Sequence, residues 1–325
     1  MLSIGVIGDP HFKTNNVKEM KQFVQVSLDY LNQTQPDLIV ILGDILDRHA
    51  NIHVEPQMMA EDYIEKSTKI AHTIVIIGNH DRKDNFDFLT TIHPFNALKK
   101  WPNLDIVDQG LVKIIKGFTL AFIPYVPPGR FKEAYDKIVG NKRIDLIFAH
   151  QEFSGCVMNS ITSKDGDNWD CNMPFVISGH IHQKQELENV LYVGTPIQHE
   201  FGDDSNKGLH LIKLTDNDME IIFKKLNIYR KITKTIKASE IYNFEPPENC
   251  DLKLTIVGTS AEIKALSISD LVRNLRKKCK VDFDTQSIIS KTHIYKNRNY
   301  LSNLLSCSKL NDRQISKLKS TININ

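Results

Sequence analysis

Short runs of apolar, mostly β-branched residues recur along the first two thirds of this 325-residue chain, and helix-like segments separate the early runs. Such runs are typical of buried strands. In Val17–Leu31 apolar residues recur at helical spacing, and Met58–Ile70 is a second expected helix. Strands that alternate with helices and then become denser predict an α/β domain built in layers. The predicted strands are Leu2–Ile7, Leu38–Leu42, Thr73–Ile77, Leu104–Val107, Thr119–Ile123, Leu146–Ala149, Phe175–Ser178, Leu191–Gly194 and Leu209–Leu214.

Five clusters of polar residues follow these strands. Groups at the carboxyl ends of strands in an α/β sheet converge on one rim, so we expect the clusters to form one site. In chain order they are Asp9-Pro10-His11, Gly43-Asp44-Ile45-Leu46-Asp47, Gly78-Asn79-His80-Asp81, His150 and Gly179-His180-Ile181-His182.

The residue types in these clusters indicate a metal site. Imidazole and carboxylate groups without cysteine suit manganese, iron or zinc. Asp9 and His11 are two positions apart, so both side chains can leave the same face of an extended segment, and His180 and His182 repeat this spacing. The carboxylate of Asp44 can touch both ions of a pair about 3.5–4 Å apart. Glycines that allow a sharp backbone turn precede four of the clusters: Gly8, Gly43, Gly78 and Gly179.

Each cluster taken alone also fits a structural explanation, such as a surface turn, a helix start or a local hydrogen bond. All five together, each after a strand, favour the metal site. The roles of Asp47 and His49 stay open. Solvated or ordinary packing positions are expected for the other histidines, which are His53, His72, His93, His199, His210 and His293.

The charge of the chain is divided unevenly. Residues 1–223 carry 21 Lys and Arg against 30 Asp and Glu, whereas residues 224–325 carry 20 against 9. A basic terminal segment indicates a polyanion or an acidic partner, or else a solvated helix face. Five cysteines without a C-x-x-C pair favour a reducing compartment. The first residues resemble no signal peptide and no run is long enough to span a membrane, so we expect an intracellular, cytoplasmic protein.

The change in character near residue 224 predicts a domain boundary. We expect a first domain at 1–223, a linker at 224–240, a small α+β domain at 241–290 and a tail at 291–325. The second domain would contain strands Asp251–Val257 and Lys280–Phe283 and a basic helix, Ser269–Cys279. A short amphipathic helix is expected at Asp312–Ser320.

The motif series D-x-H, G-D-x-x-D, G-N-H-D, H and G-H-x-H resembles the calcineurin-like metallophosphoesterase superfamily over residues 3–214. This resemblance implies a four-layer sandwich of two sheets with outer helices, and a pair of divalent cations, Mn²⁺ in first place with Mg²⁺, Fe²⁺ or Zn²⁺ as alternatives. It further implies that His80 is catalytic and that Asp81 orients it. One metal would take Asp9, His11, Asp44 and His182, and the other Asp44, Asn79, His150 and His180.

A narrower resemblance rests on Asp47-Arg48, on the segment Tyr192–Asp204 and on Lys207-Gly208, which look like the SbcD-type DNA repair nucleases and the related phage and large-virus recombination endonuclease subunits. It implies DNA as substrate, an SbcC-type SMC-like ATPase as partner, a homodimer, and a C-terminal capping domain whose tail docks on the ATPase. For a virus, the site of action would be the host cytoplasm. Exonuclease and endonuclease action are both open. The alternatives are a phosphatase or phosphodiesterase acting on nucleotides, RNA ends or phosphoproteins, and a metal-free scaffold.

Overall fold

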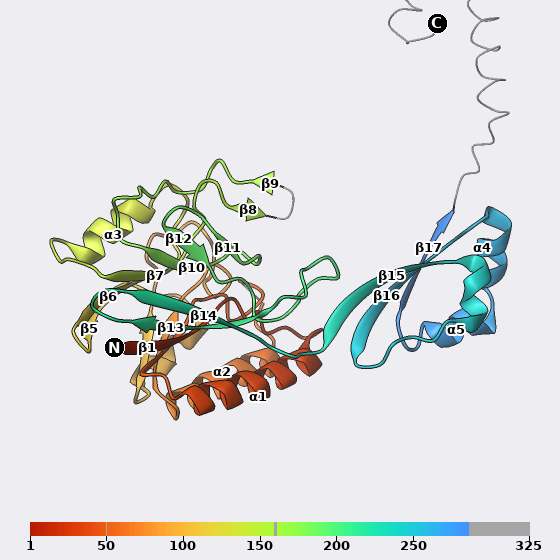
Figure 1. The fold of residues 1–325 in the computed structure, drawn as a ribbon, viewed down its shortest axis with the longest axis horizontal. Coiled ribbons are helices and arrows are strands. Elements are labelled where there is room, and N and C mark those ends of the chain that lie inside the picture. The colour runs from red at the N-terminus through yellow and green to blue at the C-terminus, as the bar shows by residue number, and fades with distance from the viewer. Residues whose placement is uncertain (50, 159–160, 286–325) are drawn as a thin grey trace, which may run out of the picture. The chain divides into compact units, whose positions relative to one another are not determined.

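A computed structural model describes residues 1–49, 51–158 and 161–285 of the chain. The chain is divided into two compact units (Figure 1). The first comprises Met1–Ile232 with Glu248–Asp251, and the second comprises Thr233–Pro247 and the described residues from Leu252 onward. No helix in the described part of the chain is both long and apolar enough to cross a membrane.

The first sheet of the larger unit has six strands and two covering helices. Strands β1 to β4 are parallel to one another. Strand β13 is antiparallel to β1, and β14 is antiparallel to β13. The order is β14 (Met219–Lys225), β13 (Gly208–Leu214), β1 (Leu2–Ile7), β2 (Leu38–Ile41), β3 (His72–Ile76) and β4 (Leu104–Val107). The helices are α1 (Val17–Thr34) and α2 (Val54–Thr68), and a 3-10 helix, η1 (Pro94–Lys100), precedes β4.

The second sheet also has six strands, of which β6, β7, β10 and β12 are parallel. The order is β11 (Gln185–Glu186), β12 (Val190–Tyr192), β10 (Val176–Gly179), β7 (Leu146–His150), β6 (Phe118–Ile123) and β5 (Leu111–Ile115). Helix α3 (Phe131–Val139) covers it, and a two-stranded ribbon of β8 (Val157–Met158) and β9 (Ile161–Thr162) follows β7.

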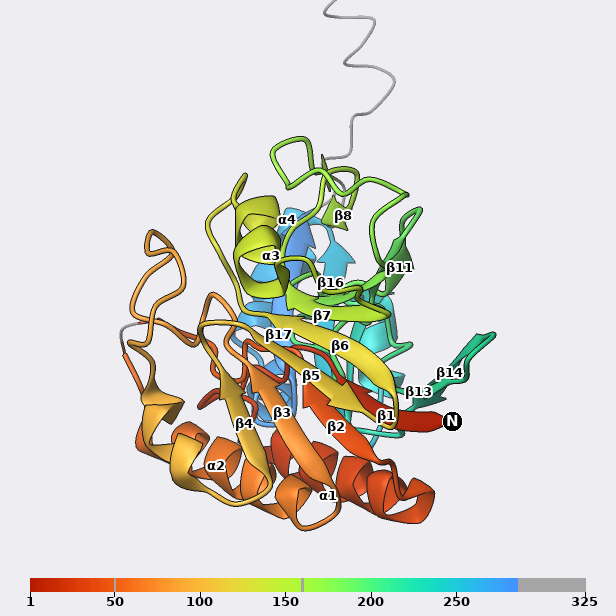
Figure 2. The ribbon, with the colours of Figure 1, turned by 90° about the vertical axis from the view of Figure 1, so that its left-hand side faces the viewer.

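Three apolar layers hold the sheets and helices together. Because successive side chains of a strand point to opposite faces, Val6 packs between the two sheets while Ile7 packs under α1 and α2. In the same way Phe122 lies between the sheets, where it stacks on Phe148, and Ile123 packs against α3. Figure 2 shows α1 and α2 on one side of β1–β4 and α3 on the far side of β6 and β7. The predicted four-layer sandwich is therefore confirmed.

The strand ends explain why this sandwich can carry a site. Each of the nine predicted strands matches a strand of the structure, whereas β5, β14 and the short strands β8, β9 and β11 were not predicted. The carboxyl ends of β1, β2 and β3 in one sheet and of β7 and β10 in the other lead directly into the five polar clusters. Helix α2 begins four residues before its predicted start, because Pro56 fits within a first helical turn.

The smaller unit is an α+β module. Its sheet has the order β15 (Arg230–Lys237), β16 (Cys250–Gly258), β17 (Lys280–Thr285), with α4 (Ser260–Ser267), α5 (Asp270–Leu275) and the 3-10 helix η2 (Ala238–Asn243). Burial alternates along β16, so only one face of the sheet is covered. The segment predicted as a linker contains β15, and the predicted basic helix ends earlier, at Leu275. The predicted tail and the helix Asp312–Ser320 lie outside the described residues.

Candidate metal centre

Asp44, directly after β2, lies at the centre of the site. Its carboxylate is 2 % exposed, and its two oxygens face different groups. Oδ1 lies 3.3 Å from Nε2 of His150, and Oδ2 lies 3.7 Å from Nε2 of His11. One carboxylate therefore stands between two sets of candidate ligands, as the bridging position of a metal pair requires.

The first set gathers around Oδ1 of Asp44. The side-chain oxygen of Asn79 lies 2.9 Å from Nε2 of His150 and 2.8 Å from Nδ1 of His180, and these two nitrogens are 3.3 Å apart. Nδ1 of His150 lies 2.7 Å from the carbonyl oxygen of Leu42. When Nδ1–H donates to this carbonyl, the lone pair of Nε2 faces Asn79 and His180. A hydrogen bond of this kind from the other ring nitrogen usually supports a metal-binding imidazole.

The second set of candidate ligands includes His11, which faces Oδ2 of Asp44. Nε2 of His11 and Nε2 of His182 approach to 3.0 Å. Oδ1 of Asp9 accepts the backbone N–H of His180 at 3.0 Å, whereas its Oδ2 is buried without a hydrogen-bond partner in the described residues. The converging imidazole nitrogens of His11 and His182, and the buried carboxylate oxygen of Asp9 that has no partner, are both features that suit a divalent cation.

The electrostatics of this pocket also suit a cation. Burial raises the pKa of Asp9 to about 7, and the neighbouring charge of Asp44 acts in the same direction. Burial lowers the pKa of His182 to about 4 and that of His11 well below its usual value, so both imidazoles are neutral at pH 7. Neutral imidazole is the form that binds metals. His150 differs, because the charges of Asp44 and Asp9 outweigh burial and raise its pKa to about 9, so a bound cation would take the place of its proton.

The backbone is bent at three of the candidate ligands. His11, Asp44 and His180 have φ of 47°, 46° and 78°, in the left-handed region that side chains other than glycine rarely adopt. Such strain is typical of functional sites, where the surrounding structure holds it in place.

Glycines are needed here for close approach more than for turning. Among the four predicted turn glycines only Gly43 has a positive φ, of 104°. A Cβ on Gly78 would lie 2.3 Å from Oδ1 of Asp44, and one on Gly179 would lie 2.4 Å from Oδ1 of Asp9. The prediction that all four glycines serve sharp turns was therefore wrong for three of them, including Gly8, whose Cβ would meet the Gly194 carbonyl.

His80 lies at the open side of the pocket. Its side chain is 35 % exposed and its Nε2 is 3.9 Å from Oδ2 of Asp44. Its backbone N–H donates to Oδ1 of Asp44 at 2.8 Å, and its Nδ1 lies 2.9 Å from the carbonyl oxygen of Asp47. The ring of His49 stacks on it, with centroids 5.0 Å apart. These contacts fix the ring so that Nε2 points toward the metal pocket.

Asp81 does not hold the His80 ring directly, in contrast to the prediction. Its carboxylate accepts the backbone N–H groups of Leu46 and Gly78, at 2.9 and 3.1 Å. Because these amides belong to the second and third clusters, Asp81 ties the two loops together. The ring of His80 is positioned by Asp47 instead, through its backbone carbonyl.

Two buried polar residues at the site were missed by the sequence reasoning. Arg82 is 2 % exposed and donates to the carbonyl of Tyr125 at 2.8 Å and to that of Asp87, so it anchors the loop that carries Asn79 and His80. His199, expected to be an ordinary packing or solvated position, is buried with its ring centroid 5.0 Å from that of His11. Their only sequence signals are that Arg82 directly follows G-N-H-D and that His199 lies in the segment Tyr192–Asp204.

The sequence profile of the calcineurin-like phosphoesterases matches residues 2–184, which include all five clusters. The chain belongs to this family, whose members use divalent metals, and it is a hydrolase that acts on phosphate esters. The geometry of Asp44, His150 and His180, whose ligand atoms lie within 4.8 Å of one another, agrees with a metal-binding cluster.

The chain is also similar to individual proteins of a virus, a phage and a bacterium. The chain is 40 % identical over 276 residues to a protein of Invertebrate iridescent virus 6 that is described as phosphoesterase 244L, with 82 % of this chain and 97 % of that protein covered. It is 22 % identical to exonuclease subunit 1 of Enterobacteria phage T4, covering 86 % and 85 % of the two chains. It is 21 % identical to one of the subunits of nuclease SbcCD from Staphylococcus epidermidis, covering 62 % of each.

Proposed function

We propose that this protein is a two-metal phosphodiesterase that cleaves DNA as an SbcD-like nuclease subunit in recombination, repair or replication. The placement of Asp44, with one oxygen toward each set of candidate ligands, is the observation that carries the two-metal part. The DNA substrate is supported by the phage exonuclease subunit and the SbcCD subunit among its relatives.

In this proposal Asp9, His11, Asp44 and His182 hold one cation, and Asp44, Asn79, His150 and His180 hold the other. Manganese is our first choice, because imidazole, amide and carboxylate donors without thiolate suit it. Bound there, the cations would supply Lewis acidity and would activate water as the nucleophile near neutral pH.

The chain's own residues supply proton transfer and positioning. His80 in its protonated form donates Nδ1–H to the carbonyl of Asp47 and can donate Nε2–H to the oxygen that leaves the phosphorus. The Asn79 side chain, whose oxygen faces His150 and His180, can hold the phosphate as well as the cation. Asp81 keeps the loops of Asp44 and His80 at a fixed separation through its two backbone hydrogen bonds.

An SbcC-type ATPase is the proposed partner, since one relative is part of a nuclease named SbcCD. The lysines and arginines of residues 273–280 are solvent-exposed, so they are available to a polyanion or an acidic surface. The homodimer implied by the resemblance stays a prediction.

The test uses the purified chain with Mn²⁺ on three substrates: an aryl phosphodiester, single-stranded DNA and linear duplex DNA. We expect Asp44→Asn to abolish hydrolysis of every substrate that the wild type cleaves, with an unchanged far-UV circular dichroism spectrum. Asp216→Asn is the matched control, because Asp216 is exposed in the β13–β14 turn beyond Leu214, which pairs with Leu2 at the opposite end of β1.

Two outcomes would count against the proposal. Normal turnover by a folded Asp44→Asn variant would refute the two-metal site. Hydrolysis of the aryl ester without cleavage of any DNA, even after a partner ATPase is added, would refute the nuclease assignment and leave a phosphodiesterase of smaller substrates.

A further inference from the structure

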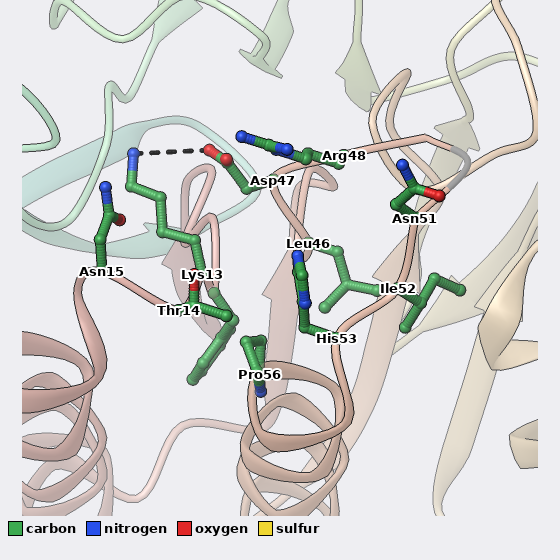
Figure 3. Close-up of a pocket in the computed structure, with 11 residues that line it drawn as sticks. Lys13, Thr14, Asn15, Leu46, Asp47, Arg48, Asn51, Ile52, His53 and Pro56 are labelled. Atoms are coloured by element: carbon green, nitrogen blue, oxygen red, sulfur yellow. Dashed lines mark ion pairs between the residues drawn. The ribbon is translucent and has the colours of Figure 1, made fainter.

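A pocket of about 200 Å³ opens beside the candidate metal centre (Figure 3). It lies between the segment that follows His11 and the segment that follows Asp44. Oδ1 of Asp47, which lines the pocket, is 3.8 Å from Nδ1 of His11, so the pocket adjoins one of the candidate metal ligands.

Several polar groups of the pocket can donate hydrogen bonds. Lys13, Asn15, Arg48 and Asn51 contribute amine, amide and guanidinium groups to its wall. Figure 3 shows Lys13 and Arg48 on either side of the Asp47 carboxylate, above the helix that begins near Pro56. The pocket therefore lies near the N-terminal end of α2, where the helix dipole favours an anion.

The charges of the pocket do not cancel. Nζ of Lys13 lies 3.4 Å from Oδ1 of Asp47, so this pair is close to neutral together. Across the residues that the structure describes, no carboxylate forms an ion pair with the exposed guanidinium of Arg48. The pocket thus carries one uncompensated positive charge on a group suited to bidentate recognition of phosphate.

We propose that this pocket binds the phosphate next to the scissile one along a nucleic-acid strand, with Arg48 as its main donor. The inference rests on the proposed nuclease function and adds to it a preference for a strand with consecutive phosphates over an isolated phosphodiester. Arg48 acts here on binding of the strand, and the proton transfer stays with His80.

The test compares two ten-residue thymidylate strands in which all linkages except those named next are uncharged methylphosphonates. One strand has a single central phosphodiester and the other has two adjacent ones, so the result does not depend on strand polarity. An ordinary thymidylate decamer and bis(4-nitrophenyl) phosphate serve as references. For the wild type we expect kcat/KM to be about tenfold higher on the strand with two phosphodiesters, after correction for the statistical factor of two. A tenfold preference corresponds to one charge-assisted hydrogen bond.

Arg48→Gln should remove this tenfold preference. Arg143→Gln is the matched control, because Arg143 is exposed just before β7, at the end of the strand opposite His150, and should keep the preference. An Arg48→Gln variant that retains the preference would overturn the subsite while the nuclease function stands. A wild type that hydrolyses bis(4-nitrophenyl) phosphate but not the ordinary decamer would refute the nuclease function, and the subsite with it.

Discussion

Replacing Gly78 by alanine should damage the metal centre out of proportion to the single methyl group that it adds. The new Cβ would lie 2.3 Å from both the backbone nitrogen and Oδ1 of Asp44, and 2.9 Å from Cε1 of His150. An ordinary contact begins near 3.4 Å, so the loops must separate by about 1.1 Å. Side-chain rotation alone cannot relieve the clash, because one of the two atoms at 2.3 Å is the backbone nitrogen of Asp44.

The expected cost follows from these distances. Overpacking of a tight interior costs about 1–3 kcal/mol of stability, which a sandwich of this size should tolerate. The effect on activity should be larger, since a displacement of about 1 Å at a catalytic group can cost about 10²-fold in rate. We therefore expect a folded Gly78→Ala protein whose affinity for Mn²⁺ is reduced and whose kcat/KM falls at least about 100-fold.

The assay measures Mn²⁺ binding by calorimetry, hydrolysis of an aryl phosphodiester and thermal unfolding by circular dichroism. Gly202→Ala is the matched control, because a Cβ there meets nothing within 4 Å and Gly202 has no positive φ. Wild-type metal affinity and turnover in Gly78→Ala would refute the reasoning, because the crowding would then be relieved without moving Asp44.

Three further predictions concern other parts of the site. His80→Gln should lower kcat by about 10²–10⁴-fold with the Mn²⁺ content unchanged by elemental analysis, since in our proposal its ring donates a proton and is not a metal ligand; loss of the metal would contradict this role. Arg82→Met should lower the free energy of unfolding by about 3 kcal/mol in a urea titration, because it leaves the carbonyls of Tyr125 and Asp87 without their donor; an unchanged midpoint would show that water replaces the guanidinium. Adding Mn²⁺ at about 100 times its Kd to chelator-treated protein should stabilise it by about 2.7 kcal/mol and raise Tm by about 5–10 °C. Asp44→Asn should show a much smaller shift in Tm.

The layered fold could be predicted because its signals are local. The parallel strands are buried on both faces, so they stand out as continuous apolar runs, and five of them end in ligand-type residues. The smaller unit was harder to predict, because β15 alternates lysine with β-branched residues and has only one buried residue, Ile236. A strand of this kind resembles a charged linker when it is read without its partners.

The finer geometry of the site could not be read from sequence for a different reason. Neighbours in sequence need not be neighbours in space: Asp81 follows His80, yet its carboxylate turns to the amides of Leu46 and Gly78. Likewise Arg82 is charged but buried, against the usual tendency of arginine, because backbone carbonyls surround its guanidinium. Only the folded chain shows which carbonyls and amides are available.

The hydrogen bond from the backbone N–H of His80 to Oδ1 of Asp44 joins the proposed metal ligand to the proposed proton donor. In the proposed site, the carboxylate oxygen of Asp44 that would hold a cation also accepts the backbone N–H of His80, and so would help to place that histidine. Exchanging one divalent ion for a larger one would therefore move the proton donor as well. If Asp44 and His80 act as proposed, the choice of metal and the choice of leaving group are coupled, and a change of cation should change which esters are cleaved fastest.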